Sequence, residues 1–518
     1  MPQNIPMNVL RRAVTNSSDD LTEPSSRPLV SWPLILALVV FVAGTMWSSV
    51  LADPDSYWHI AVGRWMVENR QLPTHDMFSY TVPGVAWTAH EWLSELVLFA
   101  AYQQAGFVGL TVLVSACFAV TAAYLMRFLF DRLEPIHAIP IGFVFLAVMS
   151  THFLARPHVL VWPLTALWVG TLTEAGEQRR GPPWWLLIVL LLWANLHASY
   201  TLGLGLAAAL AADAIWQRET MAERIATTKR WALFGAGCVV AVLCNPHGYG
   251  SLVHAVSVMG MKQTLALVNE WKSADFHEFQ MLLLWVAMVL GLAFAGRLRL
   301  SPVRGLTVVG LLYLALKHQR YHATLGLISP FLLATPMAAG LPRDTAAQDG
   351  SARTVDYWMH LLARRSRPMG VMLVTLLAVC YGLMGQRGMT VTPVESNSPA
   401  RALAAFAATG IKANVLNSYG FGGYLIYRGV PVFVDGRADM YGDAFITEVA
   451  DALTLKGPRK LEQLIAKYHV GWTLLAPESP AVALLDHLPA WERLYSDSVS
   501  VVHVRRELLQ TARATPSR

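Results

Sequence analysis

Charged residues are scarce in this sequence, and that scarcity limits what the chain can be. Asp, Glu, Lys and Arg make up 14% of the 518 residues, whereas hydrophobic residues make up 54%. A soluble globular domain usually carries about 25% charged residues. Because the apolar residues gather in many separate runs, a single membrane anchor is excluded as well. The composition therefore predicts a polytopic membrane protein.

Cysteine is also rare, and its positions exclude two further classes. The cysteines are Cys117, Cys238, Cys244 and Cys380. All of them lie inside or at the edge of apolar runs, and none shows CxxC spacing. Neither a disulfide framework nor a thiolate metal site is expected. The sequence also lacks an internal repeat, which many transporters contain.

The basic residues do not form the patch typical of a nucleic-acid-binding protein. The formal net charge is +6. Lys and Arg nevertheless occur mainly in short loops between apolar runs, where they determine membrane topology. No nucleic-acid partner is therefore expected.

Eleven apolar runs are long enough, or nearly so, for transmembrane helices of roughly 20 residues. They lie near residues 29–52, 107–126, 138–152, 158–172, 184–196, 200–216, 231–244, 279–296, 305–316, 322–340 and 369–386. The first run is longer than the apolar core of a signal peptide. We therefore expect an uncleaved first span, preceded by a polar cytoplasmic tail.

The distribution of Lys and Arg sets the expected orientation. With a cytoplasmic N-terminus, most of these residues fall in inner loops, as the positive-inside rule requires. Counting residues 90–106 as a span would invert every later loop, so this segment is interpreted as an amphipathic helix at the membrane surface. The sequence thus predicts a bacterial inner-membrane protein whose N-terminus is cytoplasmic and whose C-terminal domain is periplasmic.

Three parts of the chain follow from this interpretation. Residues 1–28 are the tail, residues 29–387 are a transmembrane domain with a periplasmic loop at 53–106, and residues 388–518 are a soluble α/β domain. In that last part ANVLNSYG, VPVFVDG, VGWTLLAP and VSVVHVRR predict strands. The segments ESNSPARALAAFAATG, AFITEVADALT and KLEQLIAKYH predict helices.

Polar residues gather at the outer ends of the predicted spans, where they suggest one hydrated cavity. The densest segment is KHQRYH, residues 317–322. The donors there are Lys317, His318, Arg320 and His322, and the segment ARPH adds Arg156. Guanidinium and ammonium groups hold phosphate or pyrophosphate well, and binding of an anionic lipid headgroup is the alternative.

The stretch after the first run carries a resemblance to a known family. DPDSYWHIAVGRWMVENRQLPTHDMFSY opens with Asp53 and Asp55, continues as a predicted helix, and ends in a segment with Pro and Asp. It resembles the start of the oligosaccharyltransferase catalytic subunit, in the GT-C superfamily of membrane glycosyltransferases. NSYGFGGYLIYRG is similar to the WWDYG acceptor-recognition segment of that subunit, with Asn417 and Ser418 among the replaced positions.

The resemblance implies a GT-C-like fold, a reaction and residue roles. Such an enzyme transfers a sugar or oligosaccharide from a polyprenyl-phosphate-linked donor to a glycan, lipid or protein acceptor at the membrane. Asp55 or Asp53, with Glu91 as a further candidate, would take the proton of the acceptor. The departing lipid phosphate would be held by Arg320, Lys317, His318, His322 and Arg156. Tyr419 and His90 would contact the acceptor.

The sequence leaves metal dependence open. The family has an acidic motif between its third and fourth spans, where this chain has THFLARPH. Either Asp55, His152 and His158 hold a divalent cation, Mg²⁺ or Mn²⁺, or the enzyme works without a metal. For Asp53, the alternative to a catalytic role is a helix N-cap.

Two functions without catalysis are also compatible with the sequence. One is a transporter or lipid-binding scaffold for an anionic polyprenyl lipid, and the other is an assembly subunit with an inactive GT-C body. The lack of internal repeats favours the enzyme over the transporter. In DGRADMYGD, Asp435, Arg437 and Asp439 are expected to pair with one another rather than to face the cavity.

Overall fold

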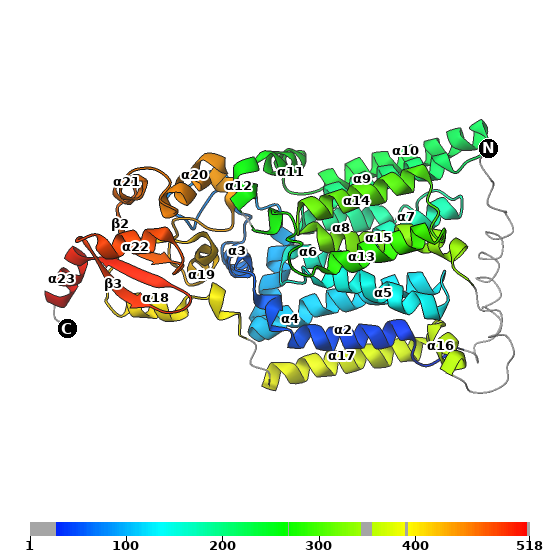
Figure 1. Ribbon diagram of the computed structural model, residues 1–518, viewed down its shortest axis with the longest axis horizontal. Helices are drawn as coiled ribbons and strands as arrows, with labels where there is room; N and C mark the ends of the chain where they lie inside the picture. Colours follow the sequence, from blue (N-terminus) through cyan, green and yellow to red (C-terminus); the bar gives the residue numbers. More distant parts are fainter. Residues whose placement is uncertain (1–26, 268, 343–354, 389–391, 515–518) are drawn as a thin grey trace.

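The protein is elongated, with a bundle of long helices at one end and a small α/β domain at the other (Figure 1). The computed structural model describes residues 27–267, 269–342, 355–388 and 392–514. Most of the predicted cytoplasmic tail lies outside these described residues.

Each of the apolar runs coincides with a helix of the bundle. These helices are α2 Trp32–Met46, α4 Trp92–Phe130, α5 Pro135–Ser150, α7 Trp162–Glu177, α8 Leu186–Leu196, α9 Tyr200–Trp216, α10 Met221–Leu243, α13 Met281–Phe294, α14 Pro302–Lys317, α15 Tyr321–Gly340 and α17 Pro368–Gly388. Four are long and apolar enough to cross a membrane, namely Trp92–Phe130, Met221–Leu243, Tyr321–Gly340 and Pro368–Gly385. Several others are apolar but shorter. The helical membrane character is thus supported, whereas the number of spans stays a prediction.

The predicted boundary near residue 106 is present inside α4. Helical dihedral angles are interrupted at Ala105 (φ −148°, ψ 22°) and Gly106 (φ 58°, ψ −144°). The positive φ favours glycine, because a Cβ at this position would be strained. Residues before the kink therefore form a separate helical segment, as the sequence predicts.

The loop that follows the first helix contains the other predicted helix. The chain leaves α2 through a short 3₁₀ turn, η3 Ser48–Leu51, and enters α3 Asp55–Asn69. Arg70 ends α3 in the left-handed conformation (φ 55°), three residues before Pro73. Much of α3 is buried, because it packs against α4 on one side and against the α/β domain on the other.

Polar clusters occupy the two ends of the bundle separately. At the end assigned to the inner side, Arg304 pairs with Asp213 (Nε–Oδ2 2.8 Å) and with Glu177 (Nη1–Oε1 3.1 Å). Arg132 also pairs with Glu177 (3.2 Å). All four residues lie in or next to predicted inner loops, so the structure brings them to one end as the alternating topology requires.

The α/β domain is built on one four-stranded sheet with strand order β1-β2-β4-β3. The strands are β1 Asn414–Asn417, β2 Val470–Leu475, β3 Trp491–Ser496 and β4 Val501–Arg505. β1 and β2 are parallel, and the other two pairs are antiparallel. The helices are α18 Ala400–Ala407, α19 Gly422–Tyr427, α20 Ala438–Leu453, α21 Lys460–Lys467, α22 Pro480–His487 and α23 Arg506–Ala514. The sequence predicted three of these strands and missed β3.

One strand prediction is wrong. VPVFVDG is a buried extended segment that makes only an isolated bridge, between Ser79 and Val432. The side chain of Asn417 satisfies its backbone instead: Phe433 N–H donates to Asn417 Oδ1 (2.9 Å), and Asn417 Nδ2 donates to the carbonyl of Val434 (2.7 Å). A side-chain amide thus replaces the neighbouring strand.

Candidate active site

Asp53 and Asp55 lie where α3 begins, between the bundle and the α/β domain. Asp53 Oδ1 accepts a hydrogen bond from the backbone N–H of Asp55 (2.8 Å), so Asp53 helps to satisfy the free donors of the first turn. The other oxygen of Asp53 faces Arg156 Nη1 (3.2 Å). Asp53 therefore supports the helix start and also belongs to an ionic cluster.

Arg156, directly before the short helix α6 Pro157–Leu160, is the centre of this cluster. Besides Asp53 it contacts Asp55 through Nη2, and Glu270 through Nη1 (2.7 Å to Oε2). Glu270 lies in the turn η4 Asn269–Trp271 and also pairs with Arg320 (Oε1–Nη1 3.2 Å). We name Asp53, Asp55, Arg156, Glu270 and Arg320 the acid–arginine cluster.

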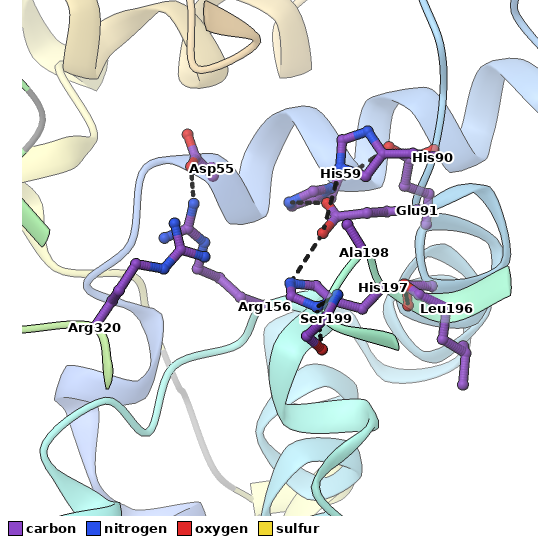
Figure 2. A network of polar contacts seen from close by, with 12 residues as sticks. Asp55, His59, His90, Glu91, Arg156, Leu196, His197, Ala198, Ser199 and Arg320 are labelled. Atoms are coloured by element: carbon purple, nitrogen blue, oxygen red, sulfur yellow. Dashed lines mark hydrogen bonds and ion pairs between the residues drawn. The ribbon is translucent and has the colours of Figure 1, made fainter. Parts of the chain in front are cut away.

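The acid–arginine cluster joins segments that are far apart in the sequence. Figure 2 shows the guanidinium groups of Arg156 and Arg320 beside each other, with Asp55 next to Arg156. The guanidinium of Arg320 also lies over the indole of Trp271, 4.5 Å from the ring centroid. The predicted convergence of Asp55, Arg156 and Arg320 is therefore present in the structure.

The carboxyl groups of the cluster differ in how readily they ionise. Burial raises the pKa of Asp53 to about 7, although Arg156 opposes the shift. Burial likewise raises the pKa of Asp55, again against Arg156. Burial would raise the pKa of Glu270 too, but Arg156 and Arg320 outweigh it and hold that pKa well below its usual range. Glu270 is the fixed anion, and Asp53 and Asp55 form the pair that can exchange a proton.

A second cluster surrounds Glu91, just before α4. Its carboxylate is 3.3 Å from His197 Nε2, 3.8 Å from His59 Nε2 and 3.9 Å from His90 Nε2. We name these four residues the Glu91 cluster. Figure 2 shows it next to the acid–arginine cluster.

The histidines of the Glu91 cluster are suited to hydrogen bonding rather than to ion pairing. Burial holds the pKa of His59 and of His197 well below the usual range, so both rings are neutral near pH 7. His197 Nδ1 accepts from the backbone N–H of Ser199 (3.1 Å), which leaves Nε2 to carry the proton that faces Glu91. Burial also raises the pKa of Glu91. Glu91 thus remains a candidate base.

The predicted phosphate site is only partly assembled. In the KHQRYH segment, Arg320 is the residue that pairs with Glu270 of the acid–arginine cluster. His318 Nδ1 faces the carbonyl of Trp271 (2.5 Å), and the exposed Lys317 lies over the ring of Tyr313, 5.9 Å from its centroid. His322 is buried inside the first turn of α15. Of the five predicted residues, the structure therefore places Arg156 and Arg320 together on Glu270.

The predicted metal ligands are each engaged with other groups, although the rings of His152 and His158 lie 4.9 Å apart. Asp55 is paired with the Arg156 guanidinium, whose positive charge opposes a nearby dication. His158 Nε2 faces the backbone carbonyl of His152 (2.9 Å), while His152 Nε2 faces Glu270 (3.4 Å). Metal binding by these three residues therefore stays a prediction.

The α/β domain closes over the start of α3. The hydroxyl of Tyr419 donates to the carbonyl of Gly436 (3.2 Å), and burial, with Asp55 adding to it, raises the pKa of Tyr419 well above its usual range. A side chain at Gly436 would meet the Asp55 carboxylate and the Trp58 indole, and one at Gly423 would meet the carbonyl of Pro54. The glycines of this domain therefore permit close contact with Asp55, a role that the sequence did not reveal.

The sequence predicted the contacts of Arg437 only in part. It pairs with Asp435, as expected (Nη2–Oδ2 2.7 Å). It also pairs with Asp76 of the first loop (Nη1–Oδ1 2.8 Å), and all three side chains are fully buried. Asp439 instead faces His254 (3.7 Å). No sequence pattern links Asp76 to Arg437, because the pair joins two distant parts of the chain.

No protein-family model matches this chain, and no curated protein matches its sequence. Among solved structures, the chain is similar to ArnT from Cupriavidus metallidurans bound to undecaprenyl phosphate, with 14% identity, a TM-score of 0.47, and coverage of 92% of this chain and 98% of that chain. It is also similar to the Archaeoglobus fulgidus oligosaccharyltransferase in the apo form, with 11% identity, a TM-score of 0.43, and coverage of 85% and 69%. Both are GT-C glycosyltransferases, the superfamily that the opening stretch of the sequence resembles.

Proposed function

We propose that this protein is a GT-C-type membrane glycosyltransferase. It transfers a sugar or oligosaccharide from a polyprenyl-phosphate-linked donor to a glycan, lipid or protein acceptor at the periplasmic face of a bacterial inner membrane. The observation that carries the proposal is the acid–arginine cluster, in which titratable carboxylates and two guanidinium groups meet at the end of the bundle next to the α/β domain.

The carboxylates supply the base that the reaction needs. An acceptor hydroxyl attacks the sugar carbon as its proton leaves, and a positioned carboxylate takes that proton. Asp55 is the proposed base because it lies beside Arg156 and under the α/β domain, where an acceptor would arrive. Asp53 contacts the same guanidinium group. An ionised Asp53 opposes ionisation of Asp55, because the two charges repel, whereas a protonated Asp53 does not.

The arginines supply the group that stabilises the leaving phosphate. When the bond between sugar and phosphate breaks, negative charge collects on the lipid phosphate, and guanidinium groups stabilise it through charged hydrogen bonds. Arg156 and Arg320 are both held by Glu270. A phosphate oxygen would take the place of one Glu270 contact on each arginine, so Glu270 keeps the two guanidinium groups oriented before the donor binds.

Turnover of lipid-linked sugars by the purified protein tests this function. We expect protein-dependent release of polyprenyl phosphate from at least one member of a panel of polyprenyl-phosphate sugars, measured by chromatography of a radiolabelled carrier. Binding of the panel without release would instead favour the lipid-binding scaffold. Passage of the intact lipid across vesicle membranes would favour the transporter.

The rate of transfer should rise with pH through about 7. The Asp53–Asp55 pair shares one environment, and burial raises the pKa of Asp53 to about 7. Below that pH Asp53 holds a proton and Asp55 is the weaker base, whereas loss of the Asp53 proton adds a negative charge beside Asp55 and makes Asp55 a stronger base. Asp53→Asn removes the neighbouring negative charge, so the acid limb should move to lower pH. If the rate of the Asp53→Asn variant falls at the same pH as that of the unmodified protein, ionisation of this pair does not control the rate.

A methyl group at Gly436 should disturb the site without unfolding the protein. Gly436→Ala places its Cβ against the Asp55 carboxylate and the Trp58 indole. A displacement of about 1 Å in a reacting group lowers the rate by roughly 10²-fold, so we expect a loss of that order. Gly420→Ala is the matched control, because nothing lies within 4 Å of its added Cβ. Equal activity of the two variants would contradict the proposed position of Asp55.

A further inference from the structure

Three ligand-type side chains from distant segments meet beside the Glu91 cluster. They are His90, His254 in α11 Gly250–Gly260, and Asp439 in the first turn of α20. One ligand atom from each lies within 4.8 Å of the others. The rings of His90 and His254 are 4.6 Å apart at an angle of 37°, and His254 Nε2 is 3.7 Å from Asp439 Oδ2.

Hydrogen bonding does not account for this group. The separation of 3.7 Å between His254 and Asp439 is longer than a hydrogen bond. His254 Nε2 is buried and has no hydrogen-bond partner among the described residues. Buried polar atoms in native proteins are nearly always satisfied, so an unpaired nitrogen that faces a carboxylate and a second imidazole points to a ligand-binding position.

A hydrogen bond also orients the ring of His90. His90 Nδ1 faces the carbonyl of Thr88 (3.3 Å), and a proton donated there leaves Nε2 as the free ring nitrogen.

We propose that His90, His254 and Asp439 bind a divalent transition-metal ion, of which zinc is the best chemical match. Two imidazole nitrogens and one carboxylate oxygen are typical zinc ligands, at about 2.0–2.2 Å from the metal. In tetrahedral geometry the ligand atoms are then about 3.3 Å apart. The His254–Asp439 separation of 3.7 Å is close to that value. The set leaves one position for water or another ligand.

The ion would join the α/β domain to the membrane-embedded part of the protein. Asp439 belongs to the α/β domain, His254 to the segment between α10 and α13, and His90 to the first loop. A neighbouring contact already links two of these parts, since Asp443 Oδ1 accepts from the backbone N–H of Thr264 (2.9 Å). We name the proposed site of His90, His254 and Asp439 the metal clasp. It lies next to Glu91, which is 3.9 Å from His90.

Metal binding by the full-length protein in detergent tests the clasp. After chelator treatment, the protein is titrated with Zn²⁺ by calorimetry and with Co²⁺ by visible absorption. We expect one ion per chain, with Co²⁺ bands typical of tetrahedral nitrogen and oxygen ligands. His254→Ala and Asp439→Asn should weaken binding by more than the roughly 10- to 100-fold that loss of a supporting residue costs.

Two variants serve as controls. His277→Ala removes another histidine from the same outer segment and should leave the affinity unchanged. Asp55→Asn should also leave it unchanged, which separates the clasp from the ligand set predicted from the sequence. Less than one ion per chain in the unmodified protein, or unchanged binding in both His254→Ala and Asp439→Asn, would overturn the proposal. Because no readout uses sugar transfer, the clasp and the proposed enzymatic function fail or succeed separately.

Discussion

Asp55→Asn is expected to lower the rate of sugar transfer by about 10²- to 10⁴-fold, the range that a positioned general base contributes. The amide keeps the size of the side chain and can still accept a hydrogen bond from Arg156, but it cannot take a proton from the acceptor. The protein should remain folded, because Glu270 and Asp53 still neutralise Arg156 in this variant.

Initial rates with the same lipid-linked donor measure this effect. Asp275→Asn is the matched control, because Asp275 is an exposed acid on the same side of the bundle. Donor binding should survive in Asp55→Asn, since the arginines that hold the phosphate are intact. Transfer at the unmodified rate in a folded Asp55→Asn protein would assign the base to another group, and Glu91 would be examined next.

Arg437→Gln is expected to have the largest effect on stability. The guanidinium pairs with Asp435 and Asp76, and all three side chains are fully buried. It also lies over two aromatic rings, 5.2 Å from the centroid of Phe78 and 4.9 Å from that of Trp87. Its removal leaves two buried carboxylates without a counter-charge. Breaking a buried ion pair in this way typically lowers the free energy of unfolding by about 3–5 kcal/mol.

Thermal or denaturant unfolding of the α/β domain within the full chain measures the loss. Arg513→Gln is the control, since it breaks a comparable but exposed contact with Glu492 and should change stability by about 1 kcal/mol or less. Asp435→Asn added to Arg437→Gln should recover part of the loss, because one uncompensated charge disappears. If Arg437→Gln unfolds no more easily than Arg513→Gln, the buried pair is not what holds the first loop to the α/β domain.

The sequence predicts the helices of the bundle well because their cause is local. A long apolar run forms a helix in a membrane whatever surrounds it, so every run matches an observed helix. The sequence also predicts that Asp55, Arg156 and Arg320 lie at one end of the bundle, and in the structure they meet there. Glu270 also belongs to the acid–arginine cluster, although no motif assigns it a role.

The sequence fails where a contact depends on tertiary structure. VPVFVDG has a strand composition, but the side chain of Asn417 takes its hydrogen bonds. Lys317 and His322 are close to Arg320 in sequence and yet lie apart from its ionic contacts, because the chain turns between two helices. His254 and Asp439 carry no motif, and only folding of the α/β domain onto the bundle brings them to His90.

The proposed transfer reaction requires Arg156 and Arg320 to form the phosphate site next to Asp55. A structure of the full-length protein with bound polyprenyl phosphate tests this most directly. We predict phosphate oxygens within about 3 Å of both guanidinium groups, with Asp55 facing the side from which an acceptor would approach. A phosphate bound elsewhere, with both arginines still paired to Glu270, would contradict the proposed phosphate site.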